Sequence, residues 1–166
     1  VPTYLLQTGQ TLSLVLVNPD GGRSNALAVP VGNSGPALTP NLVVHGATQV
    51  AAGPVSPGQV LVIAGFPPTS SSAVSVAPVT NNSYPTSFMG VRVLFDNVPA
   101  PIYAFGNGSA AVIVPYSVTA GNFTMISTEY NGVPSTPVRV PVQTSNPGLF
   151  TVNQSGTGQA AVLNQD

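Results

Sequence analysis

Short runs of apolar and β-branched residues, separated by turn residues, recur along the whole chain. Such runs predict β-strands. No segment keeps a helical period over two turns, and proline is too frequent for helices. The predicted strands span residues 12–17, 26–31, 42–45, 59–64, 91–95, 101–105, 110–114, 123–130 and 137–142, with weaker candidates at 149–152 and 160–163.

The turns between these runs have recognisable chemistry. Asp96-Asn97, Asn107-Gly108 and Asn131-Gly132 each separate or adjoin two apolar runs, as in tight β-hairpins. Proline lies at the starts and ends of the runs, where a missing N–H group costs least. Short strands joined by such turns predict an all-β, immunoglobulin-like β-sandwich.

An internal repeat indicates how the chain is divided. The stretch GQTLSLVLVNPDGGRSNALAVPV, from Gly9, aligns with GNFTMISTEYNGVPSTPVRVPV, from Gly121. The match continues without a gap, since Ser34-x-Pro36-x-Leu38 returns as Ser145-x-Pro147-x-Leu149, 111 residues later (145 − 34). This offset is close to the length of one immunoglobulin-like sandwich, about 100 residues.

We therefore expect a complete sandwich flanked by partial ones. Residues 1–31 are predicted to be the closing hairpin of an incomplete immunoglobulin-like domain, and residues 32–40 a linker. Residues 41–142 are predicted to form the complete sandwich. Residues 143–166 are predicted to be a C-terminal extension, either a donor strand or the entry to a further repeat. The chain starts at Val1 rather than Met, which favours a processed chain or part of a longer one.

Two segments resemble known families. NPDGGRSNALAVPV resembles the final hairpin of IPT/TIG-type immunoglobulin-like domains. AAGPVSPGQVLVIAGF, GVRVLFDNVPAPIYAF, IVPYSVTAG, YNGVPSTPV and NPGLFTVNQSGTGQAAVLNQD resemble uncharacterised immunoglobulin-like domains of large secreted and surface proteins of soil bacteria, acidobacteria especially. This second resemblance covers about residues 42–166. It implies a fold and an extracellular or cell-surface location, and it supplies no catalytic residue.

Composition changes the picture of possible partners. Charged residues make up 4% of the chain and lysine is absent, against about a quarter charged in ordinary soluble proteins. A surface with so little charge does not attract nucleic acid, and it tolerates contact with copies of itself. No apolar run approaches the roughly 18 residues of a membrane helix, so membrane insertion is not expected. Cysteine is absent, which excludes disulfides and thiolate metal sites.

Few residues are available for chemistry. His45 is the single imidazole, inside an apolar run, and is expected to be structural. The acids are Asp20, Asp96, Glu129 and Asp166, and two of them occupy predicted turns. We expect no enzyme activity, no cofactor and no catalytic or metal-binding residue, although a calcium site built mostly of carbonyl groups stays open.

Some asparagine residues are candidate sites of modification, and the aromatic residues are candidates for core packing. Sequons begin at Asn81, Asn107, Asn122 and Asn153; they are candidate glycosylation sites, with turn chemistry as the alternative. Tyr116 is placed for a tyrosine corner. The aromatic residues expected to fill the core or its ends, with a sugar-stacking platform as the alternative, are Tyr103, Phe105, Tyr116, Phe123 and Tyr130.

The partial domains lead to a functional hypothesis. The chain is expected to be a repeating structural subunit of an extracellular filament or surface fibre, joined to other copies or neighbouring repeats by β-strand complementation. The candidate assembly residues are Leu12, Leu14, Leu16, Leu149, Phe150, Val152, Val162 and Leu163. The alternative is a passive spacer or adhesion module that binds a partner or glycan through loops, with residues 67–90 as the candidate loop.

Overall fold

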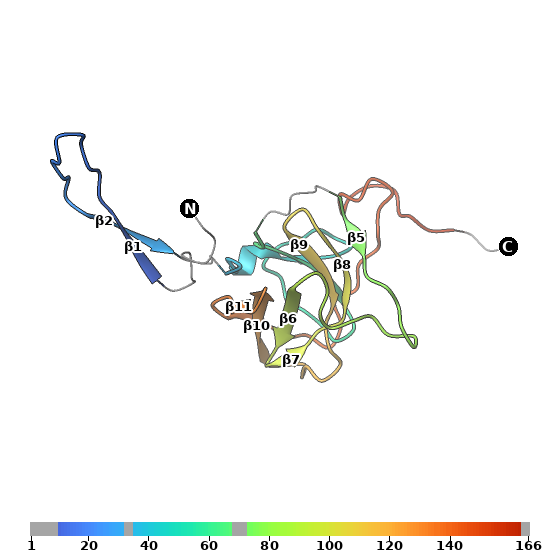
Figure 1. The fold of residues 1–166 in the computed structure, drawn as a ribbon. Coiled ribbons are helices and arrows are strands. Elements are labelled where there is room, and N and C mark those ends of the chain that lie inside the picture. Colours follow the sequence, from blue (N-terminus) through green and yellow to red (C-terminus); the bar gives the residue numbers. More distant parts are fainter. Residues whose placement is uncertain (1–9, 32–34, 68–72, 164–166) are drawn as a thin grey trace. The chain divides into compact units, whose positions relative to one another are not determined.

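A computed structural model describes residues 10–31, 35–67 and 73–163 (Figure 1). The chain divides into two compact units, residues 1–34 and residues 35–166. The predicted assembly residues all fall within the described ranges, whereas Asp166 lies outside them.

The described part of the first unit, residues 10–31, forms a hairpin. Strands β1 (Gln10–Leu14) and β2 (Leu27–Val31) pair antiparallel, with Gln10 opposite Val31 and Leu14 opposite Leu27. The prediction of a strand over residues 12–17 was wrong at both ends. Beyond Leu14 the ladder is interrupted, because the Leu16 N–H donates to the side-chain oxygen of Ser24 instead of a main-chain carbonyl.

The second unit is built from two antiparallel sheets of five strands each. In the first sheet the spatial order is β3 (Val43–His45), β4 (Val60–Ala64), β9 (Ser109–Ile113), β8 (Ile102–Gly106), β5 (Ser75–Val76). In the second sheet the order is β11 (Val133–Pro134), β10 (Phe123–Tyr130), β6 (Val91–Phe95), β7 (Val98–Pro99), and β12 (Val138–Pro141) also pairs with β10. A 3-10 turn, η2 (Pro40–Leu42), precedes β3.

The core lies between the two sheets. Alternate residues of the long strands point inward, as the period of two in an extended chain requires. Phe66 and Phe105 meet edge to face, with their ring centroids 5.5 Å apart. The largest fully buried side chains are Phe95, Phe105, Leu61, Ile63, Ile102 and Ile126. The predicted all-β sandwich is confirmed, while its assignment as immunoglobulin-like stays a prediction.

For most strands of this unit, the predicted and observed bounds differ by at most one residue at each end. The bounds of β6 and β10 equal the predicted ones. The predicted hairpin turns are also found, since Asp96, Asn97, Asn107 and Asn131 all have positive φ angles. The sequence prediction missed β5, β7 and β11, because two-residue strands have no readable alternation.

The weaker strands predicted at 149–152 and 160–163 were wrong. Only Thr151 and Ala160 form a bridge, supported by hydrogen bonds from the Val152 N–H to the Gln159 carbonyl and from the Ala161 N–H to the Phe150 carbonyl. Between them, Gln154, Gly156 and Gly158 have left-handed backbones, which break an extended strand.

Candidate functional site

The hairpin of the first unit has two unpaired edges in the part of the chain that the structure describes. Strands β1 and β2 pair with each other and with no third strand there. A two-stranded hairpin is at best marginally stable in water, and its free N–H and C=O groups can pair with another strand. Leu12 and Leu14 lie on β1, while Leu16 lies after it and is 78% exposed. The edges of the hairpin are therefore the first candidate surface.

A second candidate surface is the C-terminal arm, which we define as residues 147–163 (red in Figure 1). It carries no charged residue. Its large apolar side chains are exposed, up to 92% for Leu163. The predicted assembly residues among them are Leu149, Phe150, Val152, Val162 and Leu163. Because apolar side chains gain by leaving water, this arm is suited to pairing with another apolar surface.

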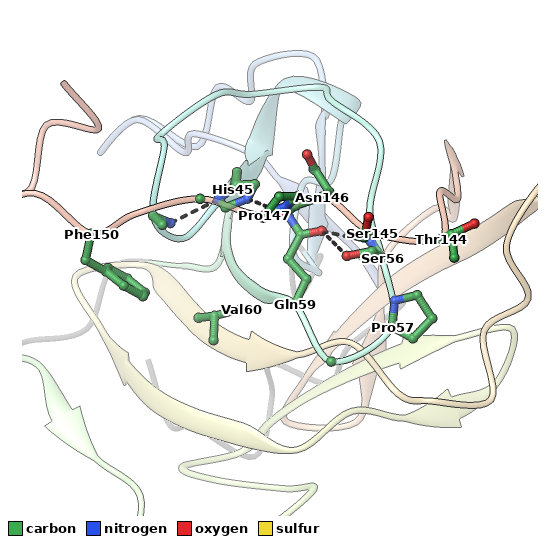
Figure 2. Close-up of a pocket in the computed structure, with 13 residues that line it drawn as sticks. His45, Ser56, Pro57, Gln59, Val60, Thr144, Ser145, Asn146, Pro147 and Phe150 are labelled. Carbon is green, nitrogen blue, oxygen red and sulfur yellow. Dashed lines mark hydrogen bonds between the residues drawn. The ribbon is translucent and has the colours of Figure 1, made fainter. Parts of the chain in front are cut away.

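His45 and Asn146 fasten the start of the arm to the sandwich (Figure 2). The buried His45 ring accepts hydrogen bonds at Nδ1 from the N–H groups of Ala47 (3.0 Å) and Thr48 (3.2 Å). Its other nitrogen, Nε2, lies 3.0 Å from the Asn146 carbonyl oxygen. Since Nδ1 accepts, the ring hydrogen lies on Nε2 and is donated to that carbonyl. Both ring nitrogens are thus engaged with the backbone.

His45, Asn146 and Pro54 together hold the start of the arm, and we call these three residues the clasp. The Asn146 side-chain amide donates to the Pro54 carbonyl oxygen at 2.7 Å. Just before it, the Gln143 N–H donates to the Val55 carbonyl oxygen at 2.8 Å. The hollow beside the clasp has a volume of about 310 Å³ and is the one drawn in Figure 2. The clasp fixes the place where the arm leaves the sandwich, a role that no sequence motif revealed.

The described carboxylates all have structural partners. Asp96 accepts hydrogen bonds from the Thr124 hydroxyl (2.8 Å) and the Met125 N–H (2.9 Å). Glu129 forms an ion pair of 2.9 Å with Arg92, the residue opposite it on β6. Asp20 accepts from the Gly22 N–H in the turn after β1. Among the described residues no three His, Cys, Asp or Glu side chains come together as a metal site.

The sequon asparagines lie on the surface, and their modification stays a prediction. Asn81 and Asn107 occupy left-handed turn positions. The side-chain oxygen of Asn122 accepts the Phe123 N–H, and that of Asn153 accepts the Ser155 N–H and hydroxyl. These contacts are turn chemistry, and they leave all four residues exposed to solvent.

The expected packing of the aromatic residues needs correction. Tyr116 is 84% exposed, and within the described residues its hydroxyl forms no hydrogen bond, so it makes no tyrosine corner. Tyr103 and Phe123 are also exposed, because they occupy outward positions of their strands. The Arg139 guanidinium lies 3.5 Å from the Phe123 ring centroid. Of the five, Phe105 is buried in the core and Tyr130 is partly buried beside it.

Within the described residues, no helix is both long and apolar enough to span a membrane. The sequence matches no protein-family model and no curated protein.

Proposed function

We propose that this protein is a structural subunit of an extracellular filament or surface fibre, in which the C-terminal arm of one copy completes the hairpin of the next. The observation that supports this most directly is that β1 and β2 pair with no third strand among the described residues. Strand donation satisfies the free backbone groups of such an edge.

The two surfaces are chemically compatible. Strands β1 and β2 and the arm contain no charged residue. Pairing of the arm with these strands would therefore bury no charge. The arm already contains two short antiparallel segments joined through Thr151 and Ala160. It could therefore add paired segments to a sheet without first ordering a free chain, which lowers the entropic cost of binding.

The geometry of such a contact is compatible with open assemblies. Each copy has one hairpin and one arm, and these are different surfaces. A contact between different surfaces propagates into filaments when it does not close into a ring. The low charge of the whole chain means that neighbouring copies repel one another weakly.

The energetics favour a reversible, concentration-dependent contact. Burying the five apolar arm side chains named above would contribute roughly 7–15 kcal/mol, at about 1.5–3 kcal/mol each. Association itself costs about 4–15 kcal/mol in lost freedom and ordering. The free energy gained by burial and the free energy cost of association are therefore of similar size. For this reason, the loss of one or two arm side chains is expected to shift assembly strongly.

Sedimentation velocity and negative-stain electron microscopy of the full chain test this function. Substituting Leu149 and Val162 by Ser removes two exposed apolar groups of the arm and should weaken assembly at least tenfold. The matched control replaces Val74 and Val79, which are similarly exposed elsewhere, and should leave assembly unchanged. A chain that stays monomeric at millimolar concentration would overturn the proposal and favour the spacer or adhesion module.

A further inference from the structure

A groove of about 780 Å³ lies on the outward face of the first sheet, which contains β3, β4, β9, β8 and β5. Its floor is formed by half-buried side chains of β4 and β9, namely Val60, Val62, Ala111 and Ile113. Tyr84 and Tyr103 line it, as does the arm through Phe150 and Val152. Its volume falls within the range of small-ligand sites, about 300–1,000 Å³.

The two tyrosines of the groove are held by the loop before β6 and by a bulge in β8. The pairing of β8 with β9 skips a residue between Ile102 and Ala104, so Tyr103 is the extra residue. Bulges of this kind redirect a side chain and are common beside functional sites. Tyr103 is 42% exposed, and its ring meets that of Tyr84 edge to face at 5.5 Å.

Backbone hydrogen bonds fix this tyrosine pair from both sides. The Ala77 N–H donates to the Tyr103 carbonyl oxygen, and the Ile102 N–H donates to the Pro85 carbonyl oxygen, each at 2.8 Å. Neither tyrosine hydroxyl has a hydrogen-bond partner among the described residues. The rings are thus positioned in advance, and their hydroxyls remain available.

The arm residues that line the groove are also held in place. Thr151 is buried, and its side-chain oxygen accepts the Gly156 N–H at 3.1 Å. Gly156 has φ +77°, and a Cβ atom there would overlap the Thr48 carbonyl oxygen. Only glycine permits this close approach between the arm and the turn after β3.

The lining defines the kind of ligand. No charged side chain is present among the described residues that line the groove, while Gln49, Gln154 and Thr151 add neutral polar groups. A charged ligand would lose hydration there without a counter-charge. Apolar floor, aromatic rings and neutral hydrogen-bonding groups together match a pyranose, which has C–H groups on its faces and hydroxyls around its edge.

We propose that this groove binds a neutral oligosaccharide, with Tyr103 and Tyr84 contacting the sugar rings and Gln154 and Gln49 contacting the hydroxyls. A purely apolar ligand fits less well, because it would cover polar groups without pairing them. The groove shares Phe150, Val152 and Gln154 with the arm, but neither tyrosine belongs to the hairpin or the arm, so the tyrosine variants test sugar binding without changing the surfaces proposed for assembly. The two proposals can therefore fail separately.

Nuclear magnetic resonance titration of the full, isotope-labelled chain tests the site. The probes are three neutral hexasaccharides (cellohexaose, laminarihexaose and maltohexaose), a charged one (hexagalacturonate) and an apolar one (decanol). At least one neutral hexasaccharide should shift the amide signals of Ala111, Ile113 and Gln154 saturably. Tyr103→Ala should weaken that binding about tenfold, equivalent to about 1.4 kcal/mol.

Two further variants make the test specific. Tyr84→Ala removes the other ring and should weaken binding in the same direction even if Tyr103→Ala disturbs the bulge. Tyr116→Ala removes an exposed tyrosine outside the groove and should leave binding unchanged. The proposal is overturned if no neutral hexasaccharide binds at about 10 mM, if Tyr116→Ala weakens binding equally, or if decanol or hexagalacturonate binds more tightly at the same amides.

Discussion

Replacing His45 by Ala should destabilise the sandwich by about 3 kcal/mol and loosen the arm. The substitution leaves the N–H groups of Ala47 and Thr48 without an acceptor and the Asn146 carbonyl without a donor. A buried group left unpaired costs about 1–3 kcal/mol, and a partly exposed one costs less because water can replace the partner. The Ala47 contact is buried and the other two are partly buried, so we assign about 1.5 kcal/mol to the first and about 0.7 kcal/mol to each of the others.

Two variants separate the two halves of the clasp. In His45→Asn, the side-chain oxygen takes nearly the position of Nδ1 and can accept the Ala47 and Thr48 N–H bonds, as in an Asx turn, but it cannot reach Asn146. This variant loses only the bond to Asn146, so it should lose about a quarter as much stability as His45→Ala. In Gln143→Ala an exposed side chain is lost while the backbone hydrogen bond is kept, so stability should change by less than about 0.5 kcal/mol.

Urea denaturation followed by circular dichroism gives the free energy of unfolding, and hydrogen exchange gives the local effect. The Ala161 N–H, bonded to the Phe150 carbonyl, should exchange faster in His45→Ala than in Gln143→Ala. A loss below about 0.5 kcal/mol in His45→Ala, or equal losses in His45→Ala and His45→Asn, would refute the role given to the clasp.

Three further substitutions test individual contacts in the arm and the sandwich. Gly156→Ala should loosen the arm by at least about 2 kcal/mol, seen as faster exchange of the Ala161 amide, because an added Cβ would clash with the Thr48 carbonyl; unchanged exchange would contradict the close approach. Thr128→Val should be neutral or stabilise by up to about 1 kcal/mol in urea denaturation, because the buried Thr128 hydroxyl has no hydrogen-bond partner among the described residues; a loss of more than about 1 kcal/mol would show that the hydroxyl is paired. Arg92→Ala should cost no more than about 1 kcal/mol, since its ion pair with Glu129 is partly exposed to water; a larger loss would mean that the pair is effectively buried.

The longer strands of the sandwich were predictable from sequence because each is rich in apolar, β-branched or aromatic residues and is bounded by turn residues. The boundaries of β6 and β10 follow directly from such runs. The turns at Asn107 and Asn131 were also predictable, since asparagine and glycine tolerate the left-handed backbone that these turns require.

The clasp and the groove were not predictable, because both depend on contacts between distant segments. His45 and Asn146 are 101 residues apart in sequence, and no local pattern links an imidazole to a main-chain carbonyl so far away. Tyr103 was expected in the core or at its ends, with a sugar-stacking platform as the alternative. The bulge that accompanies its outward position comes from the register between β8 and β9.

Intermolecular cross-linking tests directly whether the arm of one copy meets the hairpin of another. Because the chain has no cysteine, each introduced thiol is the reactive one. Leu16→Cys places one thiol in the turn of the hairpin, and Leu163→Cys places one on the arm. Equal amounts of the two single-cysteine chains, distinguishable by mass, are mixed and treated with a short bismaleimide. Random pairing of equal amounts gives the mixed dimer, which joins the hairpin variant to the arm variant, in twice the amount of each same-variant dimer. If the arm of one copy completes the hairpin of the next, the mixed dimer should exceed this random proportion severalfold. Pairing Leu163→Cys with Val79→Cys should give no excess over the random proportion. Cross-linking in random proportions would contradict the completion of one copy's hairpin by another copy's arm.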